Sequence, residues 1–68
     1  MRYDYFLEYG NEGKHHKILD FLELDTDIEF EHEYEMGTLV IYTNEDPVEV
    51  ESMIYYATGA YADNYGQA

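Results

Sequence analysis

The sequence has 68 residues, of which 16 are Asp or Glu and three are Lys or Arg, so its formal net charge is −13 at pH 7. Nucleic acid and anionic membranes repel such a chain, and neither is expected as a direct partner. The absence of cysteine excludes disulfides and thiolate metal sites. Nine tyrosines and three phenylalanines are too many for a disordered acidic segment, so we expect one folded domain over residues 1–68.

The N-terminal residues predict a strand. Over residues 2–9, Tyr3, Tyr5, Leu7 and Tyr9 alternate with their neighbours at the period of two that a strand requires. The glycine-containing residues 10–13 that follow are typical of a turn.

Residues 14–24 allow two interpretations. Ile18, Phe21 and Leu22 have the i, i+3, i+4 spacing of an amphipathic helix, with Asp20 on the polar side. The alternative is a second strand that closes a hairpin through the preceding turn. We favour the helix.

The stretch from Asp27 to Glu35 has a carboxylate at every odd position, and its even positions are Ile, Phe, His and Tyr. This alternation predicts a strand with one side in the core and a row of carboxylates in water. Same-face residues of a strand lie about 6.6–6.8 Å apart, so the carboxylates repel one another and add nothing to stability. We therefore look to function for the reason that they are there.

A hairpin and a helix are expected next. Residues 38–43 are a β-branched run that Met36-Gly37 joins to the acidic strand as an antiparallel hairpin. Asp46 suits the N-cap of a helix that begins at Pro47, and we expect this helix to continue through Gly59 to about residue 62. Residues 63–68 are expected to be a flexible tail. One apolar stripe is expected on the helix, made of Val50, Met53, Ile54, Ala57 and Tyr61.

Together these elements predict an α+β fold, a small βαββα domain whose mostly antiparallel sheet has helices on one face. No apolar run approaches the roughly 18 residues needed to span a bilayer, and the N-terminus does not resemble a signal peptide. A cytoplasmic protein is expected. The sequence selects neither a monomer nor a dimer.

The candidate binding residues are carboxylates in and around the acidic strand, with two tyrosines of the last helix. Thirteen acids and no Lys or Arg follow Lys17. A single row of carboxylates is sparser than the phosphates of one DNA strand, which follow each other every 3.4 Å or so along the axis, so flanking rows are needed. We expect folding to gather the acids on one continuous surface. The set is Asp20, Glu23, Asp25, Asp27, Glu29, Glu31, Glu33, Glu35, Glu45, Asp46, Glu49, Glu51, Tyr55 and Tyr56.

The tyrosines divide into two groups. Tyr55, Tyr56 and Tyr65 lie off the apolar stripe of the last helix, where an exposed ring could stack on arginine of a partner. Core packing is as good an interpretation for these three. For the others, core packing is the better one, and they are Tyr3, Tyr5, Tyr34 and Tyr42.

Catalysis, a cofactor and a metal site are not expected. The single serine, Ser52, lies inside a predicted helix, and no nucleophile and base are paired. Residues 25–36 begin like a calcium loop, but Phe30 and Met36 stand where such a loop needs Gly and Glu. His32 is expected to be a packed or edge histidine.

A short, acidic, tyrosine-rich chain without cysteine resembles the phage-encoded DNA-mimic inhibitors of bacterial defence, the anti-CRISPR and anti-restriction proteins. The resemblance is one of composition and pattern, carried by the acids between residues 20 and 35 and between 45 and 51. It implies a non-catalytic inhibitor that blocks the basic DNA- or RNA-binding channel of a host protein, such as a CRISPR-Cas or restriction effector, in the host cytoplasm.

Two alternatives remain at this point. The chain could be a small acidic interaction module that docks on a basic patch without competing with nucleic acid. It could also be a domain whose acidic surface serves only solubility or adaptation to high salt, with no partner.

Overall fold

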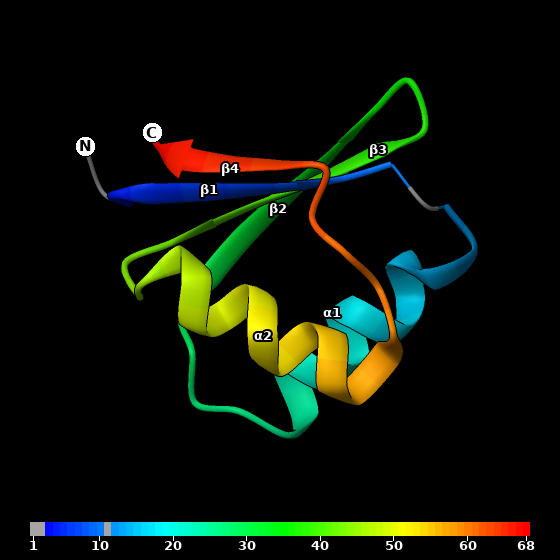
Figure 1. The fold of residues 1–68 in the computed structure, drawn as a ribbon, viewed down its shortest axis with the longest axis horizontal. Coiled ribbons are helices and arrows are strands. Elements are labelled where there is room, and N and C mark those ends of the chain that lie inside the picture. Colours follow the sequence, from blue (N-terminus) through cyan, green and yellow to red (C-terminus); the bar gives the residue numbers. More distant parts are fainter. Residues whose placement is uncertain (1–2, 11) are drawn as a thin grey trace.

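The computed structural model describes residues 3–10 and 12–68 and shows a four-stranded sheet with two helices on one of its faces (Figure 1). The predicted α+β class is confirmed. Arg2 and Asn11, which the sequence analysis assigns to the first strand and the following turn, lie outside the described residues. The elements in chain order are β1 (Tyr5–Tyr9), the 3₁₀ helix η1 (Glu12–Lys14), α1 (His15–Leu24), β2 (Phe30–Glu35), β3 (Thr38–Thr43), α2 (Pro47–Thr58) and β4 (Asn64–Gln67).

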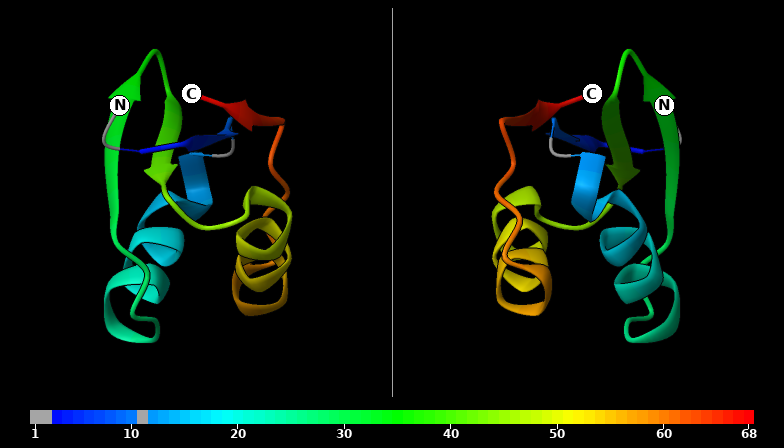
Figure 2. Two further views of the ribbon diagram at one scale, coloured as in Figure 1. Left: turned by 90° about the vertical axis from the view of Figure 1, so that its left-hand side faces the viewer. Right: turned by 90° about the vertical axis from the view of Figure 1, so that its right-hand side faces the viewer.

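The strand order is β2-β3-β1-β4, and every neighbouring pair is antiparallel. α1 connects β1 to β2 with β3 between them, and α2 connects β3 to β4 with β1 between them. Two split βαβ units of this kind make the ferredoxin-like topology. Figure 2 shows the two helices side by side on the same face, so no helix of the described residues covers the other face of the sheet.

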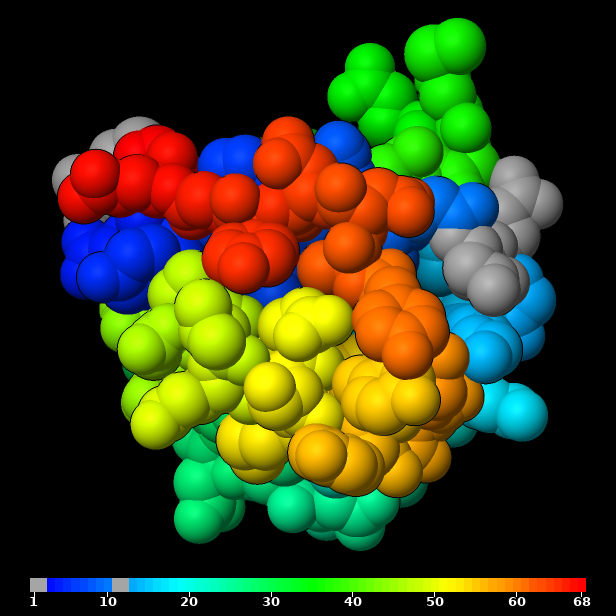
Figure 3. All heavy atoms as spheres, in the orientation of Figure 1, coloured from blue at the N-terminus to red at the C-terminus, as the bar shows by residue number. Residues whose placement is uncertain are grey.

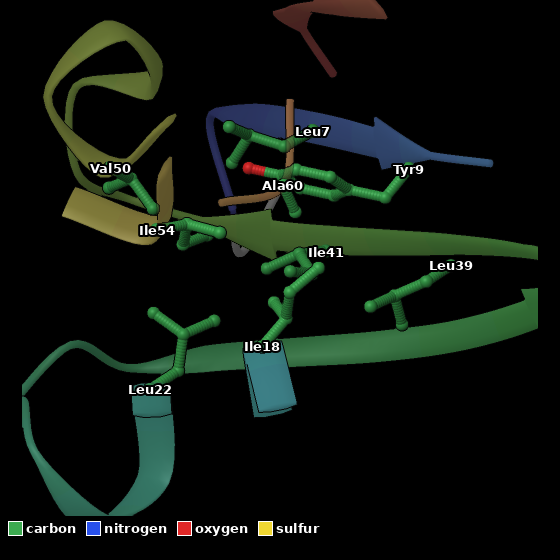
Figure 4. Close-up of a cluster of buried hydrophobic side chains, with 9 residues drawn as sticks. All are labelled: Leu7, Tyr9, Ile18, Leu22, Leu39, Ile41, Val50, Ile54 and Ala60. Carbon is green, nitrogen blue, oxygen red and sulfur yellow. The ribbon is translucent and has the colours of Figure 1, made fainter. Parts of the chain in front are cut away.

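The core lies between the helices and the sheet (Figure 4). Leu39 and Ile41 of β3 are fully buried, whereas Val40 between them is half-buried, as the alternation of a strand requires. The buried apolar residues that cluster there are Leu7, Tyr9, Ile18, Leu22, Leu39, Ile41, Val50, Ile54 and Ala60.

Residues 15–24 are helical, so the strand alternative for this segment is wrong. Ile18 and Leu22, one turn apart, are fully buried against the sheet. His15 at the helix start is also buried, and its Nε2 lies 3.1 Å from the carbonyl oxygen of Tyr9. A carbonyl can only accept, so Nε2 of His15 carries the proton.

α2 ends earlier than predicted. Gly59 has a left-handed φ of 76°, and its N–H donates to the carbonyl of Tyr55 at 2.7 Å, which closes the helix after Thr58. Lys14 Nζ donates to the Gly59 carbonyl at 3.1 Å, a favourable place for a cation at a helix C-terminus. Gly59 therefore ends the helix, contrary to the expectation that the helix would pass through it.

The buried side of α2 is also rotated from the predicted stripe. Of the five residues of that stripe, only Val50 and Ile54 are buried, and Met53 is 40% exposed. Ala57 and Tyr61 are exposed, whereas Glu51 and Thr58 on the neighbouring side of the helix are half-buried. The side of α2 that faces β1 is therefore not the side with the most apolar residues.

Residues 64–67 form β4, so the flexible tail expected for residues 63–68 is corrected. The chain after Gly59 returns to the sheet with Ala60 buried in the core, and Ala68 N donates to the Asp4 carbonyl at 2.9 Å. Gly66 lies opposite Phe6, whose ring comes within 3.5 Å of the position of an added Cβ. Backbone pairing forms this strand, which is why its polar sequence gave no signal.

The hairpin turn generates the first prediction. Met36 and Gly37 have φ values of 51° and 79°, the left-handed pair of a type I′ turn. The Met36 side chain is 98% exposed at the hairpin tip, which projects from the body of the molecule (Figure 3). Asn adopts this conformation more easily than Met, so we expect Met36→Asn to raise the free energy of unfolding by about 1 kcal/mol. Urea denaturation measures this, and Met36→Val should be less stable than the native protein. Equal stability of the Asn variant and the native protein would contradict the argument.

The core generates the second prediction. Tyr9 is fully buried, and its hydroxyl has no hydrogen-bond partner in the part of the chain that the structure describes. An unpaired buried hydroxyl is costly, so we expect Tyr9→Phe to leave the free energy of unfolding unchanged or raise it by up to about 1 kcal/mol. Tyr9→Ala, which leaves a cavity, should lower it by about 3–5 kcal/mol. Calorimetry measures both, and a clear loss in Tyr9→Phe would mean that the hydroxyl has a partner.

Candidate binding surface

β2 places its glutamates on the sheet face away from the helices. Glu31, Glu33 and Glu35 are all exposed and lie opposite Tyr42, Val40 and Thr38 of β3. We call these three glutamates the acidic ladder and the uncovered side of the sheet the open face. By register and alternation, the open face consists of Phe6, Glu8, Glu31, Glu33, Glu35, Thr38, Val40, Tyr42, Asn64 and Gly66.

The acidic strand is shorter than predicted. It begins at Phe30, so Asp27 and Glu29 belong to the loop before it, where both are exposed. Thr26 holds the start of this loop, since its Oγ1 donates to the Leu22 carbonyl at 2.6 Å and accepts the N–H of Ile28 at 3.3 Å. Pairing ends at Phe30 because its partner Thr43 is the last residue of β3. Alternation alone cannot reveal where a partner strand stops.

A second group of carboxylates lines a groove of about 390 Å³ between this loop and the start of α2. Its acidic residues are Asp25, Asp27, Glu45 and Glu49, and its apolar residues are Ile28, Val50 and Met53. Asp46 beside it is the N-cap of α2, as predicted, and its side chain accepts the Val48 N–H at 2.9 Å. Four predicted site residues therefore meet at this groove.

The remaining predicted carboxylates lie elsewhere. Asp20 and Glu23 are exposed on α1, and Glu51 is half-buried on α2. Burial and the charge of Glu51 both raise the pKa of the Tyr9 hydroxyl. The predicted acids thus do not share one face. Three of them form the acidic ladder on the open face, and four form the groove group beside the helices, which is Asp25, Asp27, Glu45 and Glu49. Glu29 lies in the loop between these two groups, and the acids on the outer sides of α1 and α2 belong to neither.

Three tyrosines gather near the end of α2. Tyr56 is 86% exposed and Tyr61 is 65% exposed, while Tyr55 between them is half-buried. The ring centroid of Tyr55 lies 5.6 Å from that of Tyr56 and 4.4 Å from that of Tyr61. A hydrogen bond with Tyr55 raises the pKa of Tyr61. Sequence reasoning missed Tyr61 because only the turn at Gly59 brings it back toward the helix. Tyr55, Tyr56 and Tyr61 are the tyrosine cluster.

The other tyrosines follow the core interpretation only in part. Tyr3 is buried and Tyr5 half-buried, but Tyr34 is 52% exposed, and its ring packs at 5.6 Å on His15. Tyr42 lies on the open face and donates to Glu33 Oε1 at 2.6 Å. Both corrections follow from the single helix layer, which covers β2 incompletely and leaves the outward residues of β3 in the open. Tyr65 is 46% exposed and lies on β4, outside the helix to which it was assigned.

His32 is an edge histidine on the helix side of β2. Its ring centroid lies 6.2 Å from that of Phe30 and 5.6 Å from that of Tyr34, so the three rings form an aromatic row that is partly exposed. Among the described residues, no three His, Asp or Glu side chains are placed to hold a metal ion. Within those same residues, no helix has the length and apolar character that crossing a bilayer requires.

Comparison of the chain with protein-family models, with curated proteins and with solved structures gave no match.

The contact between Tyr42 and Glu33 generates the third prediction. The hydrogen bond to the Glu33 carboxylate raises the pKa of the Tyr42 hydroxyl, with smaller contributions from desolvation and from the charges of Glu33 and Glu35. We expect Glu33→Gln to lower this pKa toward the usual value of about 10, and Glu35→Gln to lower it much less. NMR titration of the Tyr42 ring measures both shifts.

The sign of the pH dependence follows from the same shift. The folded-state pKa of Tyr42 lies above the unfolded-state value, so the hydrogen bond stabilises the fold below about pH 10. That contribution disappears as the pH rises through the folded-state pKa. An unchanged Tyr42 pKa in Glu33→Gln would show that the hydrogen bond does not persist in solution.

Proposed function

We propose that this protein is a non-catalytic inhibitor that binds the basic nucleic-acid-binding channel of another protein and competes there with DNA or RNA. The observation that carries the proposal is the acidic ladder, in which Glu31, Glu33 and Glu35 extend along one exposed strand. Strand geometry fixes the spacing of the Cα atoms that carry these charges, so the three carboxylates extend in one row from the same face of the sheet.

The acidic ladder is sparser than the phosphates of one DNA strand, but its spacing is commensurate with theirs. Alternate residues of a strand are about 6.6–6.8 Å apart, which is twice the rise of about 3.4 Å per phosphate along one DNA strand. The ladder therefore offers one negative charge for every two phosphates of a strand. The molecule is 29 Å long, which is shorter than the 34–36 Å or so of one turn of duplex, so its footprint would be under one turn.

The charge balance supports the proposal. Three bases can neutralise at most three of the 16 acids within the chain, and Lys14 already lies at the C-terminus of α2. A basic partner would relieve the repulsion between the remaining carboxylates. Charge of one sign also speeds the encounter with such a partner, an effect that salt suppresses.

The compositional resemblance to phage inhibitors of bacterial defence indicates where to search for the partner. CRISPR-Cas and restriction effectors hold nucleic acid in positively charged channels, which is the surface that an acidic ladder would fit. In that case the protein acts in the host cytoplasm.

A second candidate function is a docking module that does not compete with nucleic acid. The observation that favours it is the tyrosine cluster, where Tyr56 and Tyr61 expose most of their rings on the helix layer, away from the acidic ladder. Exposed tyrosines are frequent anchors of protein interfaces, and charge would then mainly raise the association rate.

The fourth prediction tests the proposed function. The partner is captured from bacterial lysate on immobilised protein at about 0.15 M salt, identified by mass spectrometry and purified. We expect excess duplex DNA or RNA to displace the protein from it, because both would occupy one channel. A complex that withstands saturating nucleic acid would contradict the mimicry.

Matched charge variants locate the binding surface. Glu33→Gln with Glu35→Gln removes two charges from the acidic ladder, and Asp20→Asn with Glu23→Gln removes two from α1. We expect the first pair to weaken binding by about a hundredfold or more, since two desolvated charge pairs contribute about 1.5 kcal/mol or more each. The second pair lies outside the acidic ladder and should change binding only a few-fold. If Tyr56→Ala weakens binding most, and the ladder variant slows only association, the docking module is the correct function.

A further inference from the structure

We propose that the outer edge of β2 accepts an extended segment of the partner as a fifth strand of the sheet, with Lys or Arg at alternate positions of that segment. The basic chemistry of the segment rests on the proposed function. The pairing itself rests on the backbone of β2.

The outer edge of β2 is open. β2 is the first strand in the sheet order, and in residues 3–10 and 12–68 no segment pairs with its outer side. It lies at the margin of the molecule, and its hairpin with β3 extends away from the helices (Figure 2). An unpaired edge of six residues is a template for strand addition.

The hairpin determines which backbone groups of β2 are free. Met36 and Gly37 form a two-residue turn, so the flanking residues Glu35 and Thr38 are a hydrogen-bonded pair. Backbone groups of an antiparallel strand alternate in direction, so those of Glu31, Glu33 and Glu35 point to β3. The N–H and C=O groups of Phe30, His32 and Tyr34 then point outward.

The pairing of β1 with β4, at the opposite edge of the sheet, independently gives the same directions for the backbone groups of β2. Ala68 N donates to the Asp4 carbonyl at 2.9 Å, so even-numbered residues at β1 direct their backbone groups toward β4. Odd-numbered residues of β1 therefore bond to β3, where their partners are Leu39, Ile41 and Thr43. The even-numbered residues of β3 are left to bond β2, and they lie opposite the glutamates.

Charge selects the occupant of this edge. On an added antiparallel strand, the residues opposite Glu31 and Glu33 would form non-hydrogen-bonded pairs, whose Cα atoms approach to about 4.5 Å. Lys or Arg at those positions would meet the carboxylates on the open face. Two antiparallel copies of this β2 edge would instead place glutamate opposite glutamate, which is unfavourable. The edge therefore disfavours self-association and favours a basic segment.

The other face of β2 adds a second requirement. Phe30, His32 and Tyr34 form the aromatic row on the helix side, with ring centroids 5.6 and 6.2 Å apart, and it is partly exposed. Side chains of an added strand would alternate between this row and the acidic ladder. The segment that fits has basic residues on one face and apolar residues on the other.

A peptide provides the direct test. The probe is an end-capped octapeptide of alternating Lys and Val, added to the intact protein and followed by amide hydrogen exchange. We expect the amides of His32 and Tyr34 to exchange at least tenfold more slowly with the peptide, because they gain partners. The amides of Glu33 and Glu35, already bonded to β3, should change little. Protection that falls on other parts of the sheet, or none at all, overturns the proposal.

A backbone variant tests the same edge. His32→Pro removes an outward N–H without touching a bond to β3, a place where proline is tolerated in an edge strand. His32→Val is the matched control, since it also removes the imidazole but keeps the N–H. We expect the proline variant to bind the peptide about tenfold more weakly than the valine variant. Equal affinity of the two folded variants overturns the proposal, and if the proline variant does not fold, the exchange pattern of the native protein decides.

The outcomes separate this inference from the proposed function. Without peptide, the amides of His32 and Tyr34 could exchange more slowly as the protein concentration increases. That result would show that a second copy of the chain pairs with the edge, and it would overturn the inference. If the peptide pairs with β2 but nucleic acid cannot displace the protein from its partner, the mimicry is wrong and the inference about the edge is correct. If nucleic acid displaces the protein from its partner but the peptide does not pair with β2, the proposed function is supported and the inference about the edge is wrong.

Discussion

The burial of β1 and β3 under two helices is the interaction on which the rest of the structure depends. Leu7, Leu39 and Ile41 fill one face of the two central strands, and Ile18, Leu22, Val50 and Ile54 close over them. In residues 3–10 and 12–68 there are two α-helices, and both lie on the same face. The opposite face and the outer strand β2 therefore remain in water, and they can carry charge that a second helix layer would exclude. The acidic ladder exists because this fold has one open side.

The sequence predicts those parts of the fold that local chemistry decides. The N-cap at Asp46, the turn at Met36-Gly37 and the spacing of Ile18 and Leu22 each follow from residues close in the chain. What it missed depends on partners distant in the chain. β4 forms only because β1 has a free side, and its four residues carry no apolar alternation of their own. The end of β2 at Phe30 likewise depends on where β3 stops.

The candidate site shows the same division. Alternation predicts correctly that Glu31, Glu33 and Glu35 share a face, because the period of two is a property of the strand itself. It cannot place that face relative to Asp25 or Glu49, whose positions follow from the loop after α1 and the packing of α2. The acids were expected on one continuous surface and fall into two groups for this reason. The tyrosine cluster depends on a reversal at Gly59 that the helical pattern conceals.

Charge on β2 has two physical consequences that need not share one purpose. Glutamates on an exposed edge keep copies of the chain from pairing, which is sufficient reason for them in any sheet with an open edge. That explanation accounts for the three residues of the acidic ladder but not for the groove group, since Asp25, Asp27, Glu45 and Glu49 protect no strand. Nor does it explain why no Lys or Arg follows Lys17, because alternating signs would also interrupt self-pairing. The basic partner that we propose would account for all three features together, and the open backbone of β2 would give that partner a place to bind.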